Sequence, residues 1–330
     1  MDLSGHGASK LLLFGEHAAV YGYPAVGVAL PDGVSVRIHP DGSNWRFHGI
    51  PAGYADIMGG LMTRAEEVLE DAFGMSAVRA LRGDMRIEAT VPPALGFGSS
   101  AAVCTAVAAA LLPELRGDRR PAPADVWRLA HELEVFFHGS PSGIDTGLSN
   151  LGGIQAFSFE GAGLPRARSL RNPDLFLLVG AVPRSADTRA LVGRIRAERE
   201  AGSKTVREAL ERLGAIAEEA IDLLGRPAGQ ETVAGIGSLA RAAQDHLREL
   251  ELSNDDLEAV LAAAADAGGV GGKLSGAGGG GAFYIIFDEA AALLRAEAAV
   301  RRVLDDIALG LPLFSYRVVA GDAERVTTAA

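Results

Sequence analysis

The chain has 330 residues, 48% of them hydrophobic and 22% charged, a globular composition long enough for one large domain or two closely packed ones. Its formal net charge of -11 disfavours nucleic acid and anionic lipid, and its longest apolar stretch, residues 101–112, is about half the roughly 20 residues of a membrane helix. Because residues 1–10 also lack a basic segment followed by an apolar core, we expect a cytoplasmic protein with neither a nucleic-acid nor a membrane partner.

Short segments of the first half have the patterns of strands. Residues 10–14 form an apolar run that predicts a buried strand, and apolar side chains alternate at residues 34–38 and 85–89 as in half-buried strands. The helices predicted from apolar spacing cover residues 55–73, 99–112 and 123–137. The first half is therefore predicted to mix helices and strands.

The second half follows a predicted strand at residues 153–159 and a loop rich in glycine and proline. The predicted order from there is a strand at 175–182, helices through 188–267, a strand at 282–287, a helix at 289–309 and a strand at 314–319. This order suits an α+β sandwich. We place the domain boundary in the loop, which gives domains at residues 1–172 and 173–330.

The sequence has one cysteine and a few basic residues that could form a local pocket. Cys104 cannot form a disulfide within the chain, and its apolar neighbours predict a buried helical position. Although the net charge is negative, a local basic pocket could hold a small anion. Candidates for such a pocket are Lys10, Arg184, Arg189 and Lys273.

A glycine-serine loop at residues 92–102 has the composition of a phosphate site. It follows a predicted strand and opens a predicted helix, where free backbone N–H groups and the helix dipole can hold an anion. Gly96 and Gly98 allow the backbone to approach the anion closely, and Ser99 or Ser100 can cap the helix. Taken alone, the same residues also fit an ordinary glycine-rich turn with a serine cap.

Two other nucleotide-binding motifs do not fit. The near match to a P-loop at Gly271-Gly-Lys-Leu lacks the hydroxyl that binds magnesium, because Leu274 follows Lys273. The segment Gly276-Ala-Gly-Gly-Gly-Gly matches a dinucleotide-binding fingerprint in letters, but it precedes a predicted strand instead of following one. We therefore exclude both.

Three segments together resemble the GHMP kinases in order and approximate spacing: residues 10–30, 92–102 and 273–287. The family's phosphate loop, P-x-x-x-G-L-G-S-S-A, stands here as Pro92-x-x-x-Gly-Phe-Gly-Ser-Ser-Ala, with Phe97 in place of leucine. The third segment begins Lys273-Leu-Ser-Gly-Ala-Gly-Gly-Gly-Gly, and Ala282 follows where cysteine is common. The resemblance implies a two-lobed α+β fold: an N-terminal, ATP-binding lobe like ribosomal protein S5 domain 2 and a C-terminal ferredoxin-like α/β sandwich, with ATP and substrate meeting between the lobes.

Two further segments resemble the mevalonate kinase forms of this family. They are Gly15-Glu-His-Ala-Ala-Val-Tyr-Gly and His138-Gly-Ser-Pro-Ser-Gly-Ile-Asp. The chain departs from those forms in having Gly7-Ala-Ser before Lys10, where Ala-Pro-Gly is frequent, and the segment from Val182 to Val192, which includes Thr188, is two residues longer. The resemblance implies transfer of the γ-phosphate of ATP to the primary hydroxyl of mevalonate, a step of isoprenoid precursor synthesis, and also Mg²⁺ and a homodimer.

The resemblance also implies roles for individual residues. Asp145 is the expected catalytic base or orienting carboxylate, Lys10 lies near it, and Ser100 and Glu134 bind Mg²⁺. The expected substrate contacts are Lys10, Glu16, His17, Ser142, Asp145 and Thr188. The expected ATP contacts are Pro93, Ala94, Leu95, Gly96, Phe97, Gly98, Ser99, Ser100, Ala101, Gly276 and Gly278.

Several of these residues also fit purely structural roles. Glu134 alone fits a solvent-facing helix position, His17 a hydrogen bond within a loop, and Ser142 and Asp145 caps of the turn and helix around them. Trp127, His131, Glu134 and His138 share one helical face, but Val135 stands where H-E-x-x-H needs its second histidine. We therefore expect no transition-metal site there.

Other functions of the same fold stay open. The chain could phosphorylate phosphomevalonate, a sugar or a sugar alcohol, bind ATP or a metabolite without catalysis, or act as an ATP-dependent decarboxylase. The joint presence of lysine, glutamate and aspartate in the expected motifs favours an active enzyme.

Overall fold

A computed structural model of the chain describes residues 1–51, 53–118, 120–161, 163–170, 174–185, 187–227, 229–319 and 321–326. It divides into two compact units: unit 1 comprises Met1–Lys10, Pro31–Ala94 and Gly98–Gly152, and unit 2 comprises Leu11–Leu30, Leu95–Phe97 and Gly153–Ala330. The long strands β1 (Leu3–Phe14) and β2 (Ala25–Pro40) each contribute residues to both units. The predicted boundary at residues 172 and 173 lies outside the described residues.

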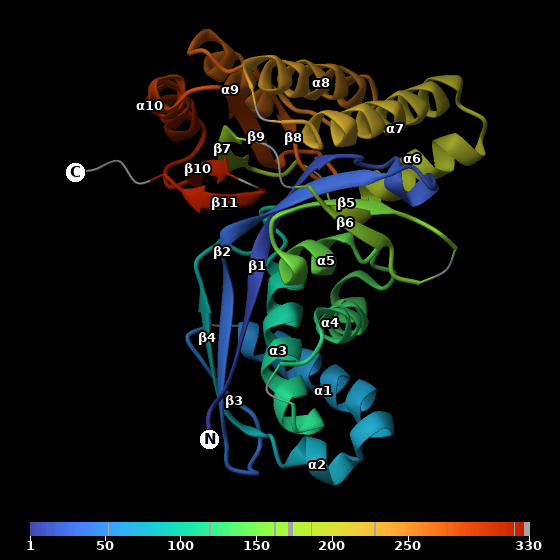
Figure 1. Cartoon of the computed structure of the whole chain (residues 1–330), viewed down its shortest axis with the longest axis vertical. Coiled ribbons are helices and arrows are strands. Elements are labelled where there is room, and N and C mark those ends of the chain that lie inside the picture. Colours follow the sequence, from blue (N-terminus) through green and yellow to red (C-terminus); the bar gives the residue numbers. More distant parts are fainter. Residues whose placement is uncertain are drawn as a thin grey trace. The chain divides into compact units, whose positions relative to one another are not determined.

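Unit 1 packs helices against one face of a sheet (Figure 1). In this sheet β2 pairs antiparallel with β4, from Val34 opposite Ala89 to Pro40 opposite Gly83. The parallel strand β3 lies beyond β4, and β1 also pairs with β2. The other elements of unit 1 are β3 (Arg46–His48), α1 (Tyr54–Phe73), α2 (Met75–Arg79), β4 (Gly83–Ala89), α3 (Ser99–Arg116), α4 (Pro123–His138) and α5 (Ile144–Leu151).

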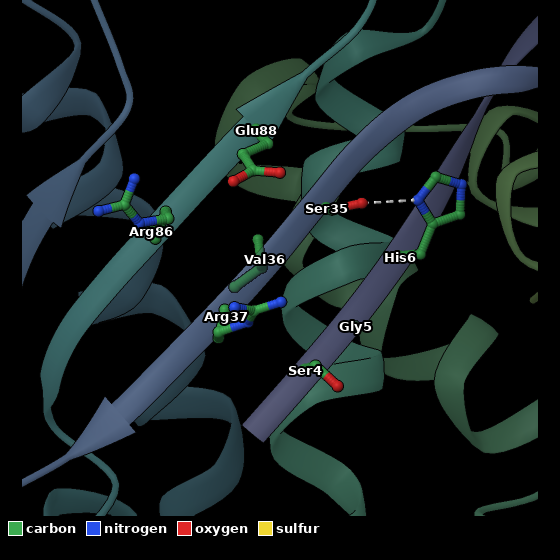
Figure 2. A pocket seen from close by; sticks show the side chains of 8 residues that line it. All are labelled: Ser4, Gly5, His6, Ser35, Val36, Arg37, Arg86 and Glu88. Carbon is green, nitrogen blue, oxygen red and sulfur yellow. Dashed lines mark hydrogen bonds between the residues drawn. The ribbon is translucent and has the colours of Figure 1, made fainter. Parts of the chain in front are cut away.

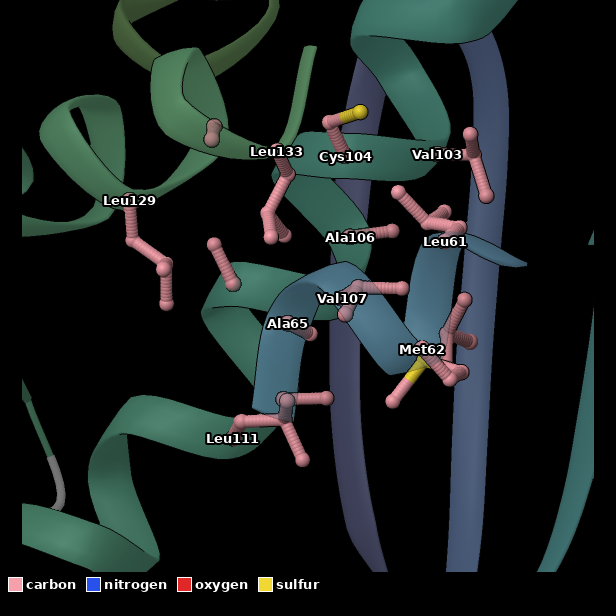
Figure 3. Close-up of a cluster of buried hydrophobic side chains, with 14 of the residues drawn as sticks. Leu61, Met62, Ala65, Val103, Cys104, Ala106, Val107, Leu111, Leu129 and Leu133 are labelled. Atoms are coloured by element: carbon pink, nitrogen blue, oxygen red, sulfur yellow. The ribbon is translucent and has the colours of Figure 1, made fainter. Parts of the chain in front are cut away.

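Helix α3 is the centre of the unit 1 core, as Figure 3 shows. Its run from Ala101 to Ala108 is buried on every side, including the free thiol of Cys104, which explains why alanine dominates the helix. Strand β1 approaches α3 closely, since a Cβ on Gly5 would lie 2.0 Å from the carbonyl oxygen of Ala106. Only glycine fits at such a contact, so the alternation of β1 leaves His6 on the opposite, exposed face.

Unit 2 contains a sheet of strand order β11-β10-β7-β9-β8. Its central strands are apolar, and every residue of β9 is buried. Helices α8, α9 and α10 pack against its strands, and Ser203 and Asn254 cap α7 and α9. The elements of unit 2 are a 3-10 turn (Ala19–Tyr21), β5 (Ile154–Ser158), β6 (Arg166–Leu170), β7 (Asp174–Val182), α6 (Thr188–Glu200), α7 (Lys204–Leu224), α8 (Gln230–Glu249), α9 (Asp255–Asp266), β8 (Gly271–Leu274), β9 (Gly281–Phe287), α10 (Ala290–Ile307), β10 (Leu313–Val319) and β11 (Asp322–Arg325).

The α+β class and the predicted elements are confirmed, although several elements extend further than predicted and some short ones, including β3, β6 and β11, were not predicted. Strand β1 begins at Leu3 instead of residue 10, and α3 continues through Pro113 to Arg116. Strand β8 was not expected, because its Gly271-Gly-Lys-Leu sequence has little strand propensity. Within the described part of the chain, no helix combines the length and apolar character needed to cross a membrane.

Candidate active site

Lys10 and Asp145 form an ion pair within unit 1. Lys10 Nζ lies 3.0 Å from Asp145 Oδ2, and the side chains are 7% and 34% exposed, respectively. Asp145 occupies the first turn of α5, whose cap is Gly143, with no capping bond from a side chain. The ring N–H of Trp127 donates to the carbonyl of Gly143 over 2.9 Å and so fixes the turn before α5. A buried cation thus holds a carboxylate that remains accessible.

The phosphate loop requires glycine at position 98. Gly98 has φ 74°, and a Cβ there would lie 2.6 Å from Cγ of Lys10, so the loop backbone packs directly on the lysine stem. Gly96 (φ 100°) and Ala94 (φ 64°) also have left-handed conformations, which are uncommon for alanine. The loop therefore brings the backbone of Gly98 and the start of α3 next to Lys10.

The serine cap expected for α3 is not formed. Gly98 is the cap residue and Ser99 is already helical, with no side-chain capping bond. The first N–H groups of α3 consequently keep the orientation that binds anions at a helix start. Phe97 is buried within unit 2, its ring centroid 6.0 Å from that of Phe314, so only its backbone can contact a phosphate.

Ser100 and Glu134 both approach one imidazole nitrogen. His138 Nε2 lies 3.1 Å from Ser100 Oγ and 3.9 Å from Glu134 Oε1. Glu134 is buried, contrary to its interpretation as a solvent-facing residue, and its Oε2 has no hydrogen-bond partner among the described residues. Burial, reinforced by the charge of Asp145 and opposed by that of Lys10, raises the pKa of Glu134 to about 8.

This donor set fits a magnesium ion. Mg²⁺ prefers oxygen ligands and takes one or two from protein when it also binds phosphates and waters, and the buried Glu134 oxygen without a partner is suited to a cation. Within the described residues, no three His, Cys, Asp or Glu side chains are placed to hold a metal ion together.

In unit 2, Glu16 and Lys273 form a fully buried ion pair. Both side chains are 0% exposed, and Lys273 Nζ donates to Glu16 Oε1 and, over 2.6 Å, to the carbonyl of Leu274. Burial lowers the pKa of Lys273, and the Glu16 carboxylate opposes that shift. Lys273 is therefore not part of an exposed anion pocket, and it holds the carboxylate of Glu16, an expected substrate contact, in an ion pair inside the protein.

Three more links join the segment around residues 12–17 to the glycine-rich third segment. Ser275 Oγ accepts from the N–H of Leu12 and donates to its carbonyl, each over 2.9 Å. The hydroxyl of Tyr284 donates to the carbonyl of Leu13 over 2.6 Å. His17, at φ 57°, places Nε2 3.0 Å from the carbonyl of Ala277, and burial lowers its pKa. His17 therefore forms a hydrogen bond, but to a distant segment and not within its own loop as the structural alternative supposed.

The two predicted ATP-contacting glycines of the third segment have different surroundings. A Cβ on Gly276 would meet no atom within 4 Å, whereas one on Gly278 would lie 2.5 Å from the carbonyl oxygen of Leu252. Both have left-handed backbones, with φ 98° and 87°. Gly276 therefore leaves open space for a ligand, while Gly278 is needed for packing.

The remaining predicted substrate contacts are already engaged. Thr188 Oγ1 accepts from Arg184 over 2.6 Å, and Ser142 Oγ accepts from the N–H of Ile144 over 3.3 Å, as the turn-capping alternative predicts. The Arg184 guanidinium lies beside the phosphate loop, since a Cβ on Gly96 would be 3.0 Å from its Nη2. Among the described residues its buried Nε has no partner, and burial lowers its pKa.

Two segments of the sequence match models of known domains. Residues 60–153 match the GHMP kinases N-terminal domain, and residues 207–306 match the GHMP kinases C-terminal domain. A curated mevalonate kinase from Archaeoglobus fulgidus is 31% identical over 264 residues, which cover 80% of this chain and 87% of the relative. The chain belongs to the GHMP kinase family. This GHMP kinase is also 28% identical over 293 residues to mevalonate kinase from Thermococcus sibiricus, covering 81% and 84% of the two chains.

Its fold agrees with solved structures of the family. Mevalonate kinase from L. major in complex with R-mevalonate superposes with a TM-score of 0.79 and 22% identity over 97% of each chain. The mevalonate kinase of Methanococcus jannaschii gives a TM-score of 0.72 and 21% identity over 97% of this chain and 98% of that one. These likenesses confirm the GHMP kinase fold.

Sequence patterns alone do not identify three polar residues of this GHMP kinase site. Trp127 anchors the turn before Asp145, and His138 contacts both candidate metal ligands. Arg184 was predicted as a basic-pocket candidate and as a weaker substrate-contact candidate, and it lies against Gly96 of the phosphate loop. For Trp127 and His138, the sequence signal that could have indicated a role was the helical face that they share with Glu134.

Proposed function

We propose that this protein transfers the γ-phosphoryl group of ATP to the C5 hydroxyl of mevalonate, giving 5-phosphomevalonate and ADP for isoprenoid precursor synthesis. The carrying observation is the Lys10–Asp145 pair packed on Gly98 of the phosphate loop, in a chain that is 31% identical to a curated mevalonate kinase. The curated relatives at 28% identity bear the same name, which supports mevalonate over the other acceptors.

Asp145 and Lys10 are proposed to act on the acceptor hydroxyl. The Asp145 carboxylate accepts the hydroxyl proton as the oxygen attacks the γ-phosphorus, and the bond from that phosphorus to the β-phosphate bridging oxygen breaks to release ADP. Lys10 Nζ, 3.0 Å from the carboxylate, orients it and stabilises negative charge on the transferring group. The exposure of the two side chains fits these two roles, because Asp145 is accessible to a substrate whereas Lys10 is buried.

The loop and the start of α3 are proposed to hold the phosphates. Backbone N–H groups of residues 96–101 would bind the β- and γ-phosphates, and Ser100 with Glu134 would hold Mg²⁺. Bound there, Mg²⁺ would neutralise phosphate charge. His17, Ser142 and Thr188 are proposed as mevalonate contacts.

Four broader assignments complete the proposal. Mg²⁺ is the cation and a homodimer the assembly, both inferred from the family resemblance, and the cytoplasm is the location, inferred from the sequence of residues 1–10 and the lack of a long apolar stretch. The domains are residues 1–172 and 173–330, which is supported by one family-domain match on each side of that boundary.

An acceptor panel tests the function. Purified protein with ATP and Mg²⁺ is assayed for ADP release with mevalonate, phosphomevalonate and galactose, and the products are identified by ³¹P NMR. We expect turnover with mevalonate and a new phosphomonoester resonance. Preferential turnover of phosphomevalonate or galactose would reassign the substrate, release of carbon dioxide would indicate a decarboxylase, and ATP binding without release on any acceptor would indicate a binding protein.

A further inference from the structure

The outer face of the unit 1 sheet carries two arginines side by side. Alternation along β2 and β4 buries Val36 and Ile87 against the core and exposes Arg37 and Arg86 on the other side (Figure 2). Arg37 and Arg86 are direct partners in the antiparallel register, so their Cα atoms are about 5 Å apart. Two like charges are therefore held next to each other on an exposed surface.

Within the described residues, neither arginine forms an ion pair with an acidic side chain, although the Asp2 carboxylate shares a hollow with both and lies close enough to Arg37 for that charge to help lower the pKa of Asp2. Arg37 and Arg86 form no hydrogen bond or ion pair there. The nearby carboxylate of Asp84 is already used, 2.6 Å from Arg46 and 2.8 Å from His48. In a chain of net charge -11, these two adjacent arginines are a local concentration of positive charge.

The surface around the pair is hollowed and lined by further polar groups. Arg37 and Arg86 both line two hollows, of about 360 and 410 Å³. In the first of them, His6 Nδ1 lies 3.1 Å from Ser35 Oγ, which gives an imidazole and a hydroxyl beside the arginines (Figure 2). Glu88 also lines this hollow, and it makes no ion pair with either arginine among the described residues.

These groups match a phosphate better than a monovalent anion. Like charges directly opposite each other destabilise a sheet, so an anion that binds both arginines relieves that repulsion. Guanidinium groups bind phosphate oxygens in pairs, and a phosphate has enough oxygens for both arginines and a hydroxyl donor. We propose that the Arg37–Arg86 face, comprising Ser4, His6, Ser35, Arg37 and Arg86, is a second anion site for a phosphate or diphosphate group, separate from the phosphate loop.

The test is a titration of inorganic diphosphate into the full-length, metal-free protein by calorimetry. Since the phosphate loop also binds such anions, the variants identify the site: Arg37→Gln/Arg86→Gln removes the pair, and Arg196→Gln/Arg302→Gln removes two exposed arginines on α6 and α10 as a matched charge control. We expect the first variant to lose one binding event or weaken it about tenfold, and the control to change it less than twofold.

A third variant should strengthen diphosphate binding instead of weakening it. Glu88→Gln removes the carboxylate from the hollow, so diphosphate should bind two- to fivefold more tightly. A parallel titration with glycerol 3-phosphate separates a site for the free anion from one for a phosphorylated metabolite. Unchanged binding in Arg37→Gln/Arg86→Gln, equal weakening in the control, or a single binding event shared by all variants would overturn the proposal. Unchanged kcat and KM in the double variant would show that the fold is intact.

Discussion

The buried Glu16–Lys273 pair should show strong coupling between its two charges. Removing one partner of a buried pair leaves an uncompensated charge and typically destabilises by about 3–5 kcal/mol, whereas replacing both by apolar groups is often nearly neutral. Both side chains are 0% exposed, so this estimate applies without reduction for solvent. We expect Glu16→Leu and Lys273→Met each to lower the free energy of unfolding by about 3–5 kcal/mol, and the double variant to recover most of that loss.

The chain offers a matched control for this cycle. Lys204 and Glu208 form an i,i+4 pair at 3.6 Å on α7, with side chains 76% and 56% exposed. Lys204→Met and Glu208→Leu should therefore couple by no more than about 0.5 kcal/mol. Chemical unfolding followed by circular dichroism measures all the variants. Additive losses in the Glu16–Lys273 cycle, with coupling below about 1 kcal/mol, would refute the assignment of a closed ion pair.

The same cycle separates two roles for Glu16. If Glu16 acts through Lys273, either single variant should change the KM for mevalonate by a similar factor, and the double variant should change it no further. If Glu16 contacts mevalonate directly, Lys273→Met should leave a smaller defect than Glu16→Leu, and the two defects should add. The four links between residues 12–17 and the third segment favour the first result.

Two further predictions concern unit 1. Gly98→Ala forces alanine into φ 74° and places its Cβ 2.6 Å from Lys10 Cγ, so kcat should fall at least about tenfold. Gly117 is the control, because it has φ 64° but no atom within 4 Å of an added Cβ. Gly117→Ala should therefore lower the melting temperature but leave kcat unchanged. The pKa of Glu134 is raised to about 8 by burial and by Asp145, so the folded state favours the protonated carboxyl, and the stability of metal-free protein should fall between pH 5 and pH 8. Glu134→Gln should remove that fall, which thermal unfolding measured across this pH range would show. If the melting temperature of the variant still fell with rising pH, Glu134 would not be the group responsible.

Local patterns predicted the elements that position the site because their signals are short in range. The alternation at residues 34–38 and 85–89 and the apolar run of β9 depend only on neighbouring side chains, and the structure confirms them. The strand-loop-helix order around the phosphate loop followed for the same reason. Strand β8 was missed because tertiary contacts stabilise it: α8 packs against it, and Gly271 has no room for a side chain beside the carbonyl of Gly237.

The interactions that were not predicted connect residues far apart in sequence. Glu16 and Lys273 are 257 positions apart, and nothing in either local segment indicates that the two charges neutralise each other inside the protein. The prediction of a serine cap for α3 was wrong for a different reason. Serine is a good cap, but the side chain of Lys10 occupies the space beside position 98, so glycine is the cap residue. Burial of Glu134 likewise depends on the packing of α4 in the unit 1 core.

The most direct measurement compares Asp145→Asn with the unchanged protein under saturating mevalonate, ATP and Mg²⁺. Asparagine keeps the size of the side chain but cannot accept the hydroxyl proton, and it removes the charge paired with Lys10 at 3.0 Å. We expect kcat to fall by at least about a hundredfold, while the dissociation constant for ATP changes less than about threefold and the circular dichroism spectrum is preserved. Phosphomevalonate formation at near-normal kcat in this variant would contradict the assignment of Asp145 as the catalytic carboxylate.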